Sequence, residues 1–248
     1  MANATFNAGI DYFGLESASS NALKVKSSAE NRSKQSTSGA NTAGDAVVVD
    51  SWGETAAPSA EYDVVDALDE STFPQLGSVT NITGIGPVVF GTVTIATQTG
   101  SCPTVSASGQ MVQTGAVQLR EYTLPDLNLT ARHRAQDFLG FCTIKKGNAA
   151  ADADADYGLA SVSATFPIVI TTAMPKGNLK TYDLHGDMAT CAYTMNWYSA
   201  TAPTIELAQA ATDLNATMSE PVAKTDPEGG YTQYTWTVAF PMVGTEHT

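Results

Sequence analysis

The sequence predicts a mainly β protein, a β-barrel or β-sandwich with one or two short helices and an extended N-terminal arm. Three observations lead to this prediction: runs that alternate large and small residues, a composition rich in Thr, Ser, Ala, Val and Gly, and a low charged fraction of 15%. β-Branched residues pack well on a pleated sheet, and charged residues usually make up about a quarter of a soluble domain. A chain of 248 residues is long enough to bury a substantial core.

The strand signals begin at Leu76 and continue to the end of the chain. The clearest runs from Tyr231 to Val243, where large and small residues alternate until Pro241. The segments 87–96, 159–172 and 188–198 also have strand character, and Gly109 to Arg120 alternates more weakly. Turn residues separate these runs at Thr99-Gly100, Lys146-Gly147-Asn148, Pro175-Lys176-Gly177-Asn178 and Glu228-Gly229-Gly230.

Two short segments have helical character. The segment Ala131 to Leu139 carries several charged residues and is followed by Gly140. Between Thr204 and Met218 the apolar residues recur at helical spacing, and Pro203 precedes the segment. We therefore expect one or two helices among eight or more strands, the pattern of a barrel or sandwich.

Residues 1–44 form the predicted N-terminal arm. From Glu16 to Gly44 the chain is rich in Ser, Ala and Asn and has few large apolar residues, so this segment cannot form a core of its own. It is either a flexible tail or an arm that becomes ordered against neighbouring subunits. In the second case its deletion leaves the β-domain folded and impairs stacking between copies. The inter-subunit candidates are its basic residues Lys24, Lys26, Arg32 and Lys34.

The β-rich domain is predicted over residues 45–248, and its first part, residues 45–75, is predicted as an acidic linking loop. This part contains eight acidic residues and no basic residue. It is either a solvated loop or, by its charge, a contact for the basic arm of another copy. The acidic residues are Asp45, Asp50, Glu54, Glu61, Asp63, Asp66, Asp69 and Glu70.

The formal net charge of −13 limits the partners of the chain. Tight binding to nucleic acid depends on Lys and Arg side chains that displace counterions from phosphates, so we expect no such binding. An acidic surface can still border nucleic acid and keep it mobile, because like charges repel.

Three alternating carboxylates, Asp152, Asp154 and Asp156, superficially resemble a calcium loop. A helix-loop-helix calcium site needs Gly at its sixth position and Glu at its twelfth, where this sequence has Tyr157 and Ser163. We therefore predict an exposed loop tip with a charged surface and no metal site.

Histidine and cysteine patterns also fail to predict catalysis. Asp183, His185 and Asp187 alternate as a base oriented by carboxylates would, but no nucleophile motif accompanies them. His133 and Cys142 have no supporting motif as a nucleophile pair, and no phosphate-binding loop follows a strand. The expectation is a protein that is not an enzyme and uses no cofactor.

The three cysteines, Cys102, Cys142 and Cys191, occur without a CxxC motif and in odd number, so we expect buried or half-buried thiols. Residues Met1 to Ile10 have neither a basic residue nor an apolar run, and no apolar stretch is long enough to span a membrane. The expected site of synthesis is a cytoplasm, without membrane attachment.

Several stretches together resemble the tail tube proteins of phages and their relatives in contractile injection systems. The resemblance is one of layout over most of the chain, and none of the stretches is a diagnostic motif. They are the Ser/Ala-rich segment before Gly44, Leu76-Gly-Ser-Val-Thr80, Cys102 to Gly109, Tyr122-Thr-Leu-Pro125 and the run from Tyr231 to Val243.

The resemblance implies a virion structural protein that forms stacked rings, usually hexameric, around an acidic channel for DNA ejection. The implied partners are further copies of the chain and other virion tail proteins, with DNA as non-specific passing cargo. The arm before residue 45 is longer than a minimal tube protein requires. A capsid decoration protein or another virion β-protein therefore remains an alternative.

A third alternative is a carbohydrate-binding or adhesin-like β-sandwich. In that case exposed aromatic rings, such as those of Trp197 and Trp236, would stack on sugars. Packing in the core or in an interface is the alternative role for both tryptophans.

Overall fold

A computed structural model describes residues 9–20, 22–66, 73–112, 120–122, 124, 140–173, 180–226 and 228–246. The described residues form a mainly β fold with two short helices, which confirms the predicted fold class. In chain order the elements are α1 (Leu15–Ala18), β1 (Leu23–Ala40), β2 (Ala46–Val64), β3 (Val79–Ile82), β4 (Gly86–Gln98), β5 (Thr104–Met111), β6 (Arg120–Glu121), β7 (Cys142–Lys146), β8 (Ala149–Ala150), β9 (Tyr157–Ala173), β10 (Lys180–Gly186), β11 (Met188–Trp197), β12 (Pro203–Leu207), α2 (Gln209–Asp213), β13 (Thr217–Met218), β14 (Val222–Asp226), β15 (Tyr231–Pro241) and β16 (Thr245–Glu246).

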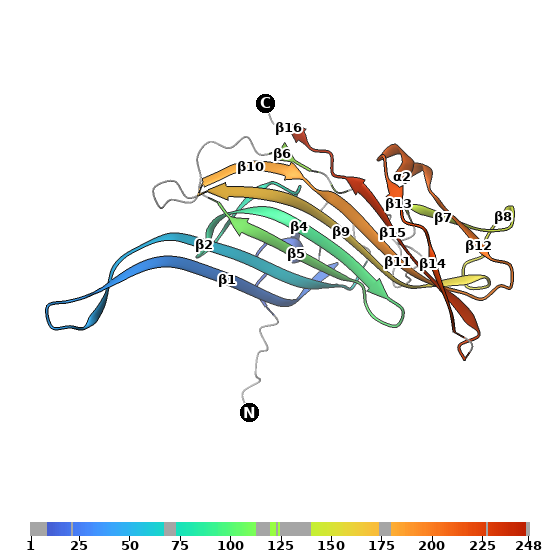
Figure 1. Ribbon diagram of the computed structural model, residues 1–248, viewed down its shortest axis with the longest axis horizontal. Coiled ribbons are helices and arrows are strands. Elements are labelled where there is room, and N and C mark those ends of the chain that lie inside the picture. Colours follow the sequence, from blue (N-terminus) through green and yellow to red (C-terminus); the bar gives the residue numbers. More distant parts are fainter. Residues whose placement is uncertain are drawn as a thin grey trace.

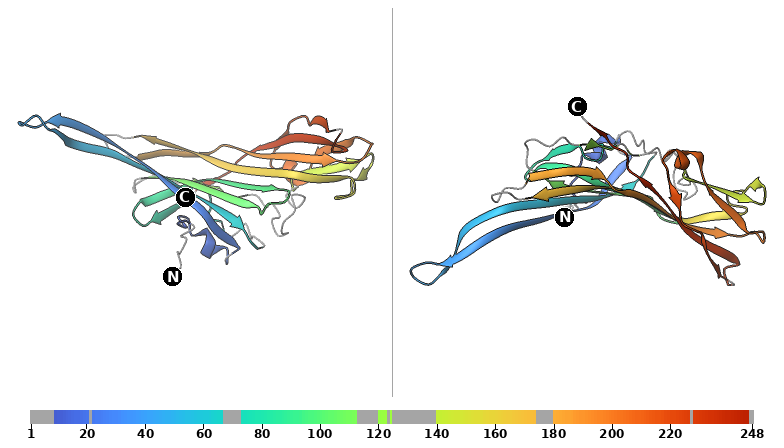
Figure 2. Two further views of the ribbon diagram at one scale, coloured as in Figure 1. Left: turned by 90° about the horizontal axis from the view of Figure 1, so that it is seen from below. Right: turned by 45° about the horizontal axis from the view of Figure 1, so that its top comes forward.

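One large antiparallel sheet dominates the structure (Figure 1). Its strand order is β1-β2-β5-β4-β9-β11-β15-β13, and β3, β10 and β14 pair with β4, β9 and β15 respectively. The order is linear, so the described sheet has open edges at β1 and at β13 and β14. The strands form a long arch, and the β1–β2 hairpin extends beyond the rest of the molecule (Figures 1 and 2).

Alternating side chains give the sheet two different faces. In β4, Val93 and Ile95 are buried, whereas Thr92 and Thr94 on the opposite face are half-buried. The same alternation continues through β5, β9, β11 and β15, because successive side chains of a strand point to opposite faces. The buried face also carries Val105, Ala107, Val162, Ala164, Phe166, Cys191, Tyr193, Met195, Trp236, Val238 and Phe240.

A three-stranded sheet, β12-β7-β8, lies against one end of the buried face. The indole Nε1 of Trp236 on β15 donates to the Cys142 Sγ on β7 at 3.2 Å. The ring of Phe141, just before β7, packs on that of Phe240 with a centroid distance of 5.1 Å. These contacts join the two sheets into one core.

The N-terminal part of the described chain closes the opposite end of the core. Phe13 packs edge-on against Phe90 of β4, with ring centroids 5.2 Å apart, and Leu15 is only 1% exposed. The side chains of Leu23 and Tyr62, at the root of the β1–β2 hairpin, are also buried. Deletion of residues 1–44 is therefore expected to remove part of the core, contrary to the expectation that the β-domain folds without them.

The predicted boundary between an arm and an acidic loop falls at the tip of this hairpin. Strand β1, from the predicted arm, pairs along its whole length with β2, from the predicted acidic loop. Residues 46–64 of the acidic segment thus form a strand, in which Val, Ala, Thr and Tyr residues separate the charges. At the tip, the Asn41 Oδ1 accepts hydrogen bonds from the backbone N–H groups of Ala43 and Asp45, both at 2.9 Å.

The outer part of the hairpin leaves the body of the molecule. Ala56 is buried, whereas Glu54 and the side chains of residues 31–34 and 36–38 are exposed. We call residues 31–55 the distal hairpin. Near its base the Arg32 guanidinium donates to the Gly84 carbonyl, between β3 and β4, at 2.6 Å. No other described strand pairs with the distal hairpin, and it projects as a two-stranded ribbon (Figure 1).

The predicted strands agree with β4, β9, β11 and β15 to within a few residues. The expected helix over residues 204–218 is wrong in extent, because residues 203–207 form β12 and only Gln209–Asp213 are helical. Strand β12 pairs with β7, and this pairing overrides the local helical periodicity. The second expected helix, residues 131–139, lies outside the described residues.

Candidate functional site

The face of the large sheet opposite the core is lined by small polar side chains. One row runs through paired positions from β1 to β11, and most of its members are Ser or Thr. Neighbouring rows have the same character. We call this surface the hydroxyl face; it comprises Ser27, Ser59, Glu61, Asp63, Thr92, Thr94, Ala96, Thr104, Ser106, Ser108, Ser163, Thr165, Thr190, Ala192 and Thr237.

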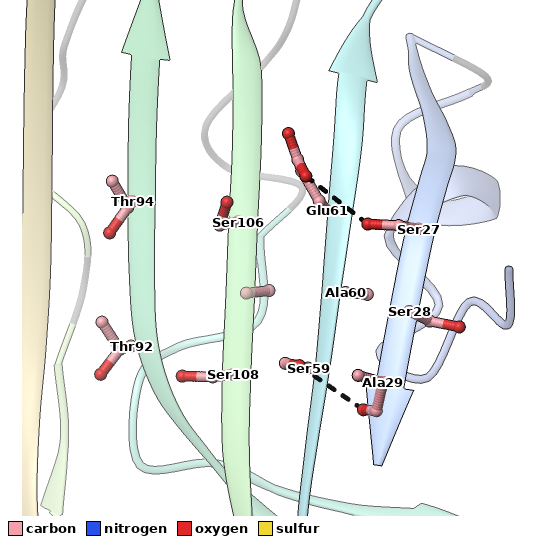
Figure 3. Close-up of a pocket in the computed structure, with 11 residues that line it drawn as sticks. Ser27, Ser28, Ala29, Ser59, Ala60, Glu61, Thr92, Thr94, Ser106 and Ser108 are labelled. Atoms are coloured by element: carbon pink, nitrogen blue, oxygen red, sulfur yellow. Dashed lines mark hydrogen bonds between the residues drawn. The ribbon is translucent and has the colours of Figure 1, made fainter.

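The hydroxyl face forms a shallow groove of about 420 Å³ over β1, β2, β5 and β4 (Figure 3). Ser106 and Ser108 lie between Thr92 and Thr94 on one side and Ser59 on the other (Figure 3). A second groove of about 450 Å³ continues over β9 and includes Ser161. Short side chains leave the backbone of the sheet close to solvent, so the face is both polar and low in relief.

Side-chain hydrogen bonds on this face are few among the described residues. The hydroxyls of Thr94 and Thr165 lie 3.1 Å apart across β4 and β9, and the Ser59 Oγ donates to the Ala29 carbonyl at 3.5 Å. The Ser27 Oγ donates to the Glu61 Oε2 at 3.5 Å (Figure 3), and the other hydroxyls of the face lie on half-buried or exposed residues. Such groups are readily satisfied by water.

The charged groups of the face gather on β1 and β2. The Lys26 Nζ lies 2.8 Å from the Glu61 Oε1 and 3.9 Å from the Asp63 Oδ1. The hydrogen bond to Glu61 raises the pKa of Lys26, and the negative charges of Glu61 and Asp63 act in the same direction. All three side chains are more than a third exposed, so this is a solvated ion pair with a small effect on stability.

The basic residues predicted to contact other subunits mostly find partners within the chain. Lys24 pairs with Glu16 at 2.8 Å, and Arg32 contacts Glu30 and, at 3.5 Å, Glu54. The pairs Arg32–Glu54 and Lys26–Glu61 cross the β1–β2 hairpin, so part of the charge polarity between residues 16–44 and 45–75 is used within one chain. Lys34 lies exposed on the distal hairpin.

The acidic residues predicted for a channel do not form one surface. Glu61 and Asp63 lie on the hydroxyl face, whereas Asp45 lies at the hairpin tip and Glu54 on the distal hairpin. Asp66 is exposed just after β2. The side chain of Asp50 is not described, and Asp69 and Glu70 lie outside the described residues.

The predicted loop tip with Asp152, Asp154 and Asp156 lies between β8 and β9, at the end of the molecule opposite the distal hairpin (Figure 1). Asp156 accepts hydrogen bonds from the Lys146 Nζ at 2.6 Å and the Asp152 backbone N–H at 3.1 Å, and both lower its pKa. Within the described residues, no three His, Cys, Asp or Glu side chains gather as a metal site would require.

The other candidate catalytic residues are not assembled by the described part of the fold. His185 and Asp187 are exposed near the end of β10, and the Asp187 carboxylate accepts the Met188 backbone N–H at 2.7 Å. The side chain of Asp183 is not described, and His133 lies outside the described residues.

The cysteines and tryptophans occupy mostly buried positions. Cys142 and Cys191 are buried and Cys102 is exposed, so the expectation of buried thiols holds for two of the three. Trp197 and Trp236 are 2% and 3% exposed. Their rings lie in the core, where a sugar ligand cannot stack on them. These two tryptophans therefore do not support carbohydrate binding.

The hydroxyl face is the surface that the sequence analysis missed. Its residues come from segments up to 210 positions apart, from Ser27 to Thr237, and only the strand registers place them together. The available signal was the type of residue at the non-core positions of each strand, where Ser, Thr and Ala recur in residues 92–96, 104–108 and 161–165.

Among the described residues, no helix has the length and apolar character needed to span a membrane. A scan against protein-family models finds no match to this chain, and a search of curated proteins finds none either.

Proposed function

We propose that the chain is a structural subunit of a homo-oligomeric tube, with its hydroxyl face directed toward a water-filled channel. The observation that carries this proposal is the composition of that face. Its central row, from Ser27 on β1 to Thr190 on β11, crosses six paired strands and consists of five Ser or Thr residues and Glu61, with no aromatic ring.

The composition favours a face toward water over a face toward a protein partner. The centre of a protein interface is enriched in aromatic residues, Met and Arg and depleted in Ser and Ala. A hydrated wall needs side chains that water satisfies and that do not project into the channel. The Ser and Thr residues around Ser106 and Thr94 meet both requirements.

The charges of the face suit a polyanionic cargo that moves through the channel. Lys26 is matched by Glu61 and Asp63, so the described part of this region offers no cluster of cations to hold phosphates. The excess of negative charge in the group repels a polyanion. We propose double-stranded DNA in a virion as that cargo, in line with the resemblance of the sequence to tail tube proteins.

The distal hairpin supports assembly with further copies. A two-stranded ribbon with both faces in water is only marginally stable. Residues 31–34 and 36–38 are exposed, and the body of the chain does not reach the tip (Figure 1). A neighbouring subunit that covers this ribbon would stabilise it, and stacked rings place such a neighbour beyond each subunit.

The first test is the size and shape of the purified full-length chain. Sedimentation velocity over a wide range of concentration and ionic strength should show large discrete species, and negative-stain images should show hollow rings or filaments. A single monomeric species under all these conditions contradicts the proposal.

The second test asks which face lines the channel. In a Cys102→Ser background, Ser106→Cys places a thiol on the hydroxyl face, and Thr212→Cys places one on exposed α2. Each thiol is labelled with a biotin maleimide. In the assembled state we expect streptavidin to capture the Thr212→Cys label and to fail with the Ser106→Cys label, because streptavidin is too large for the channel.

Disassembled subunits provide the control, because both labels should then be captured. Equal capture of the two labels in the assembled state contradicts a channel-facing hydroxyl face, even if the chain forms large species.

A further inference from the structure

The outer edge of β1 is divided into a covered part and an open part. In the described structure β1 pairs with β2 alone, so its other side carries backbone N–H and C=O groups that a further strand would use. Near the root of the hairpin, however, residues of the N-terminal segment lie against this edge. Beyond Ser28, no described strand lies there.

Three contacts place the N-terminal segment on the edge. The Val25 backbone N–H donates to the Glu16 Oε2 at 3.2 Å, so a carboxylate oxygen takes the position of a neighbouring strand's carbonyl. The Ile10 backbone N–H donates to the Ser28 Oγ at 2.7 Å. A Cβ on Gly9 would lie 2.8 Å from the Val25 Cγ1 and 3.1 Å from the Ser28 backbone nitrogen, and the φ of +145° at this position is one that other residues rarely adopt, so glycine suits this close approach.

Buried contacts hold the same segment in place. The Asp11 carboxylate accepts hydrogen bonds from the backbone N–H groups of Leu15 and Glu16, each at 3.0 Å, and from the Tyr62 hydroxyl at 2.7 Å. Phe13 and Leu15 are 6% and 1% exposed, so their side chains fix the segment to the core. The contacts on β1 are therefore part of the folded subunit.

Glu16 joins the buried anchor to the edge. Its Oε1 accepts a hydrogen bond from the Lys24 Nζ at 2.8 Å, while its Oε2 accepts the Val25 N–H. The hydrogen bond from Lys24, followed by that from the Val25 N–H, lowers the pKa of Glu16. At neutral pH the carboxylate is ionised and accepts both donors.

We infer that residues 9–19 are an edge cover, which fills the strand-pairing positions at Val25 to Ser28 and confines strand pairing with a second copy to residues 29–40 of β1. The inference rests on the proposed function for the identity of the partner. A second copy is the partner because the same sheet ends in another open strand, β14, which pairs only with β15 among the described strands. Each copy thus offers both halves of the contact.

The edge cover restricts the register in which β1 can pair with a strand of another copy. An open edge of 18 residues, from Leu23 to Ala40, would accept a partner strand in several registers, because backbone groups repeat along it. Because the edge cover occupies β1 up to Ser28, a partner strand can pair only with the residues of β1 beyond Ser28. The cover therefore sets the register of the contact.

Amide hydrogen exchange on the full-length protein tests this inference. In the wild type, residues 25–28 should be protected in the dissociated subunit and gain little on assembly, whereas residues 29–40 should gain about tenfold or more. In Glu16→Ala the Val25 amide should exchange about tenfold faster in the dissociated subunit, since its acceptor is removed. On assembly that variant should gain new protection at residues 25–28, with more heterogeneous species in sedimentation.

Two further variants make the experiment specific. Glu54→Ala removes another exposed hairpin carboxylate, one that contacts Arg32, and should leave Val25 exchange in the dissociated subunit unchanged. Gly9→Ala keeps every charge but forces the cover away from Val25 and Ser28, and should reproduce the effect of Glu16→Ala.

Two results would overturn the inference: equal gains of protection at residues 25–28 and 29–40 in the assembled wild type, or unchanged Val25 exchange in both Glu16→Ala and Gly9→Ala. If the wild type stays monomeric while both variants lose Val25 protection and associate, the tube proposal fails and the edge cover stands. If the wild type is monomeric and the variants neither exchange faster nor associate, both proposals fail.

Discussion

The body of the large sheet and the distal hairpin are built from the same antiparallel pairing but differ in what their side chains contact. In β9, β11 and β15 one face is buried against a second layer, and the other face carries small polar groups. In the distal hairpin the described side chains of β1 are exposed on both faces. The body is thus stabilised within one chain, whereas the hairpin extends beyond the elements that would bury it.

Aromatic packing accounts for much of this difference. The ring of Trp236 stacks on that of Tyr193, with centroids 5.1 Å apart and planes at 14°. Phe240 contacts both Phe141 and Phe166, with centroid distances of 5.1 Å and 6.4 Å. Buried aromatic side chains contribute large apolar areas as well as specific ring geometry. In the distal hairpin, residues 31–45 contain no aromatic residue, and Trp52 on β2 is an aromatic residue whose side chain is not described.

The largest effect is expected for Trp236→Ala in the body. The substitution removes the stack on Tyr193 and the hydrogen bond to Cys142, and leaves a cavity between the two sheets. We expect a loss of about 3–5 kcal/mol in the free energy of unfolding, the usual range for a buried Trp or Phe truncated to Ala. Denaturant titration followed by circular dichroism measures it.

Thr235→Ala is the matched control, because Thr235 neighbours Trp236 on β15 but is exposed on the opposite face. Its effect should stay within about 0.5 kcal/mol. Equal destabilisation by both substitutions would mean that the two faces do not differ in burial as described.

Shortening the distal hairpin should impair association between copies and leave the stability of the single subunit almost unchanged. Ser33 pairs with Thr55, so replacing residues 34–54 by Asn-Gly joins the strands through a two-residue turn. The free energy of unfolding of the dissociated subunit should change by about 1 kcal/mol or less, because the removed residues that are described lie outside the core. Association should be lost, as judged by sedimentation velocity.

A same-length control replaces only Thr37, an exposed uncharged residue of β1, by Ala and keeps the ribbon. If the shortened chain assembles as well as this control, the hairpin is not an assembly element. If it fails to fold, the body depends on the hairpin, and the contrast between the two regions is wrong.

The sequence predicted the body of the sheet well because each of its strands carries its own alternation. In β15, Trp236, Val238 and Phe240 are separated by Thr and Ala, so burial on one face follows from local pattern alone. Residues 46–64 were predicted incorrectly as part of a loop, and their pairing with residues 23–40 was not predicted, because residues 23–40 show no sustained apolar alternation. The two strands of the hairpin form by pairing with each other, and this pairing is invisible in either segment taken separately.

The candidate site was less predictable than the fold. Glu61 and Asp63 were identified as charged-surface residues, but their partner Lys26 was assigned to contacts with other subunits. A bulge in β1 between Val25 and Ser27 places Lys26 beside both carboxylates. Composition reveals the presence of opposite charges, whereas strand register decides whether they meet within one chain.

A smaller effect is expected where the two regions join, at Tyr62. Tyr62→Phe removes the hydroxyl that donates to Asp11 and keeps the buried ring, so we expect a loss of about 1–2 kcal/mol in the free energy of unfolding. Burial, and then the hydrogen bond to Asp11, raises the pKa of Tyr62 above its ordinary value of 10.0. Because the folded state favours the protonated phenol, wild-type stability should fall as the pH rises above 10.0, and the Phe variant should lack this contribution.

Denaturant titrations at neutral pH and above pH 10.0 measure both effects. Tyr234→Phe, at a half-buried position in the body, is the control for removing a phenol. An unchanged free energy of unfolding for Tyr62→Phe at both pH values would show that the Asp11 contact does not help to fix the hairpin root.

The reactivity of the three native cysteine thiols tests the burial of the body with the smallest change to the structure. Cys102 lies exposed in the turn between β4 and β5, whereas Cys142 and Cys191 lie in the body. Burial raises the pKa of Cys142 to about 11 and that of Cys191 to about 12. Since the thiolate is the reactive form, we expect one thiol to react rapidly with a disulfide reagent at pH 8 and the other two only after denaturation. Cys102→Ser should abolish the rapid phase of the thiol reaction. If a rapid phase remains in this variant, a buried thiol of the body must become exposed on the timescale of the reaction. The aromatic side chains that cover Cys142 would then not be stably packed without a neighbouring subunit.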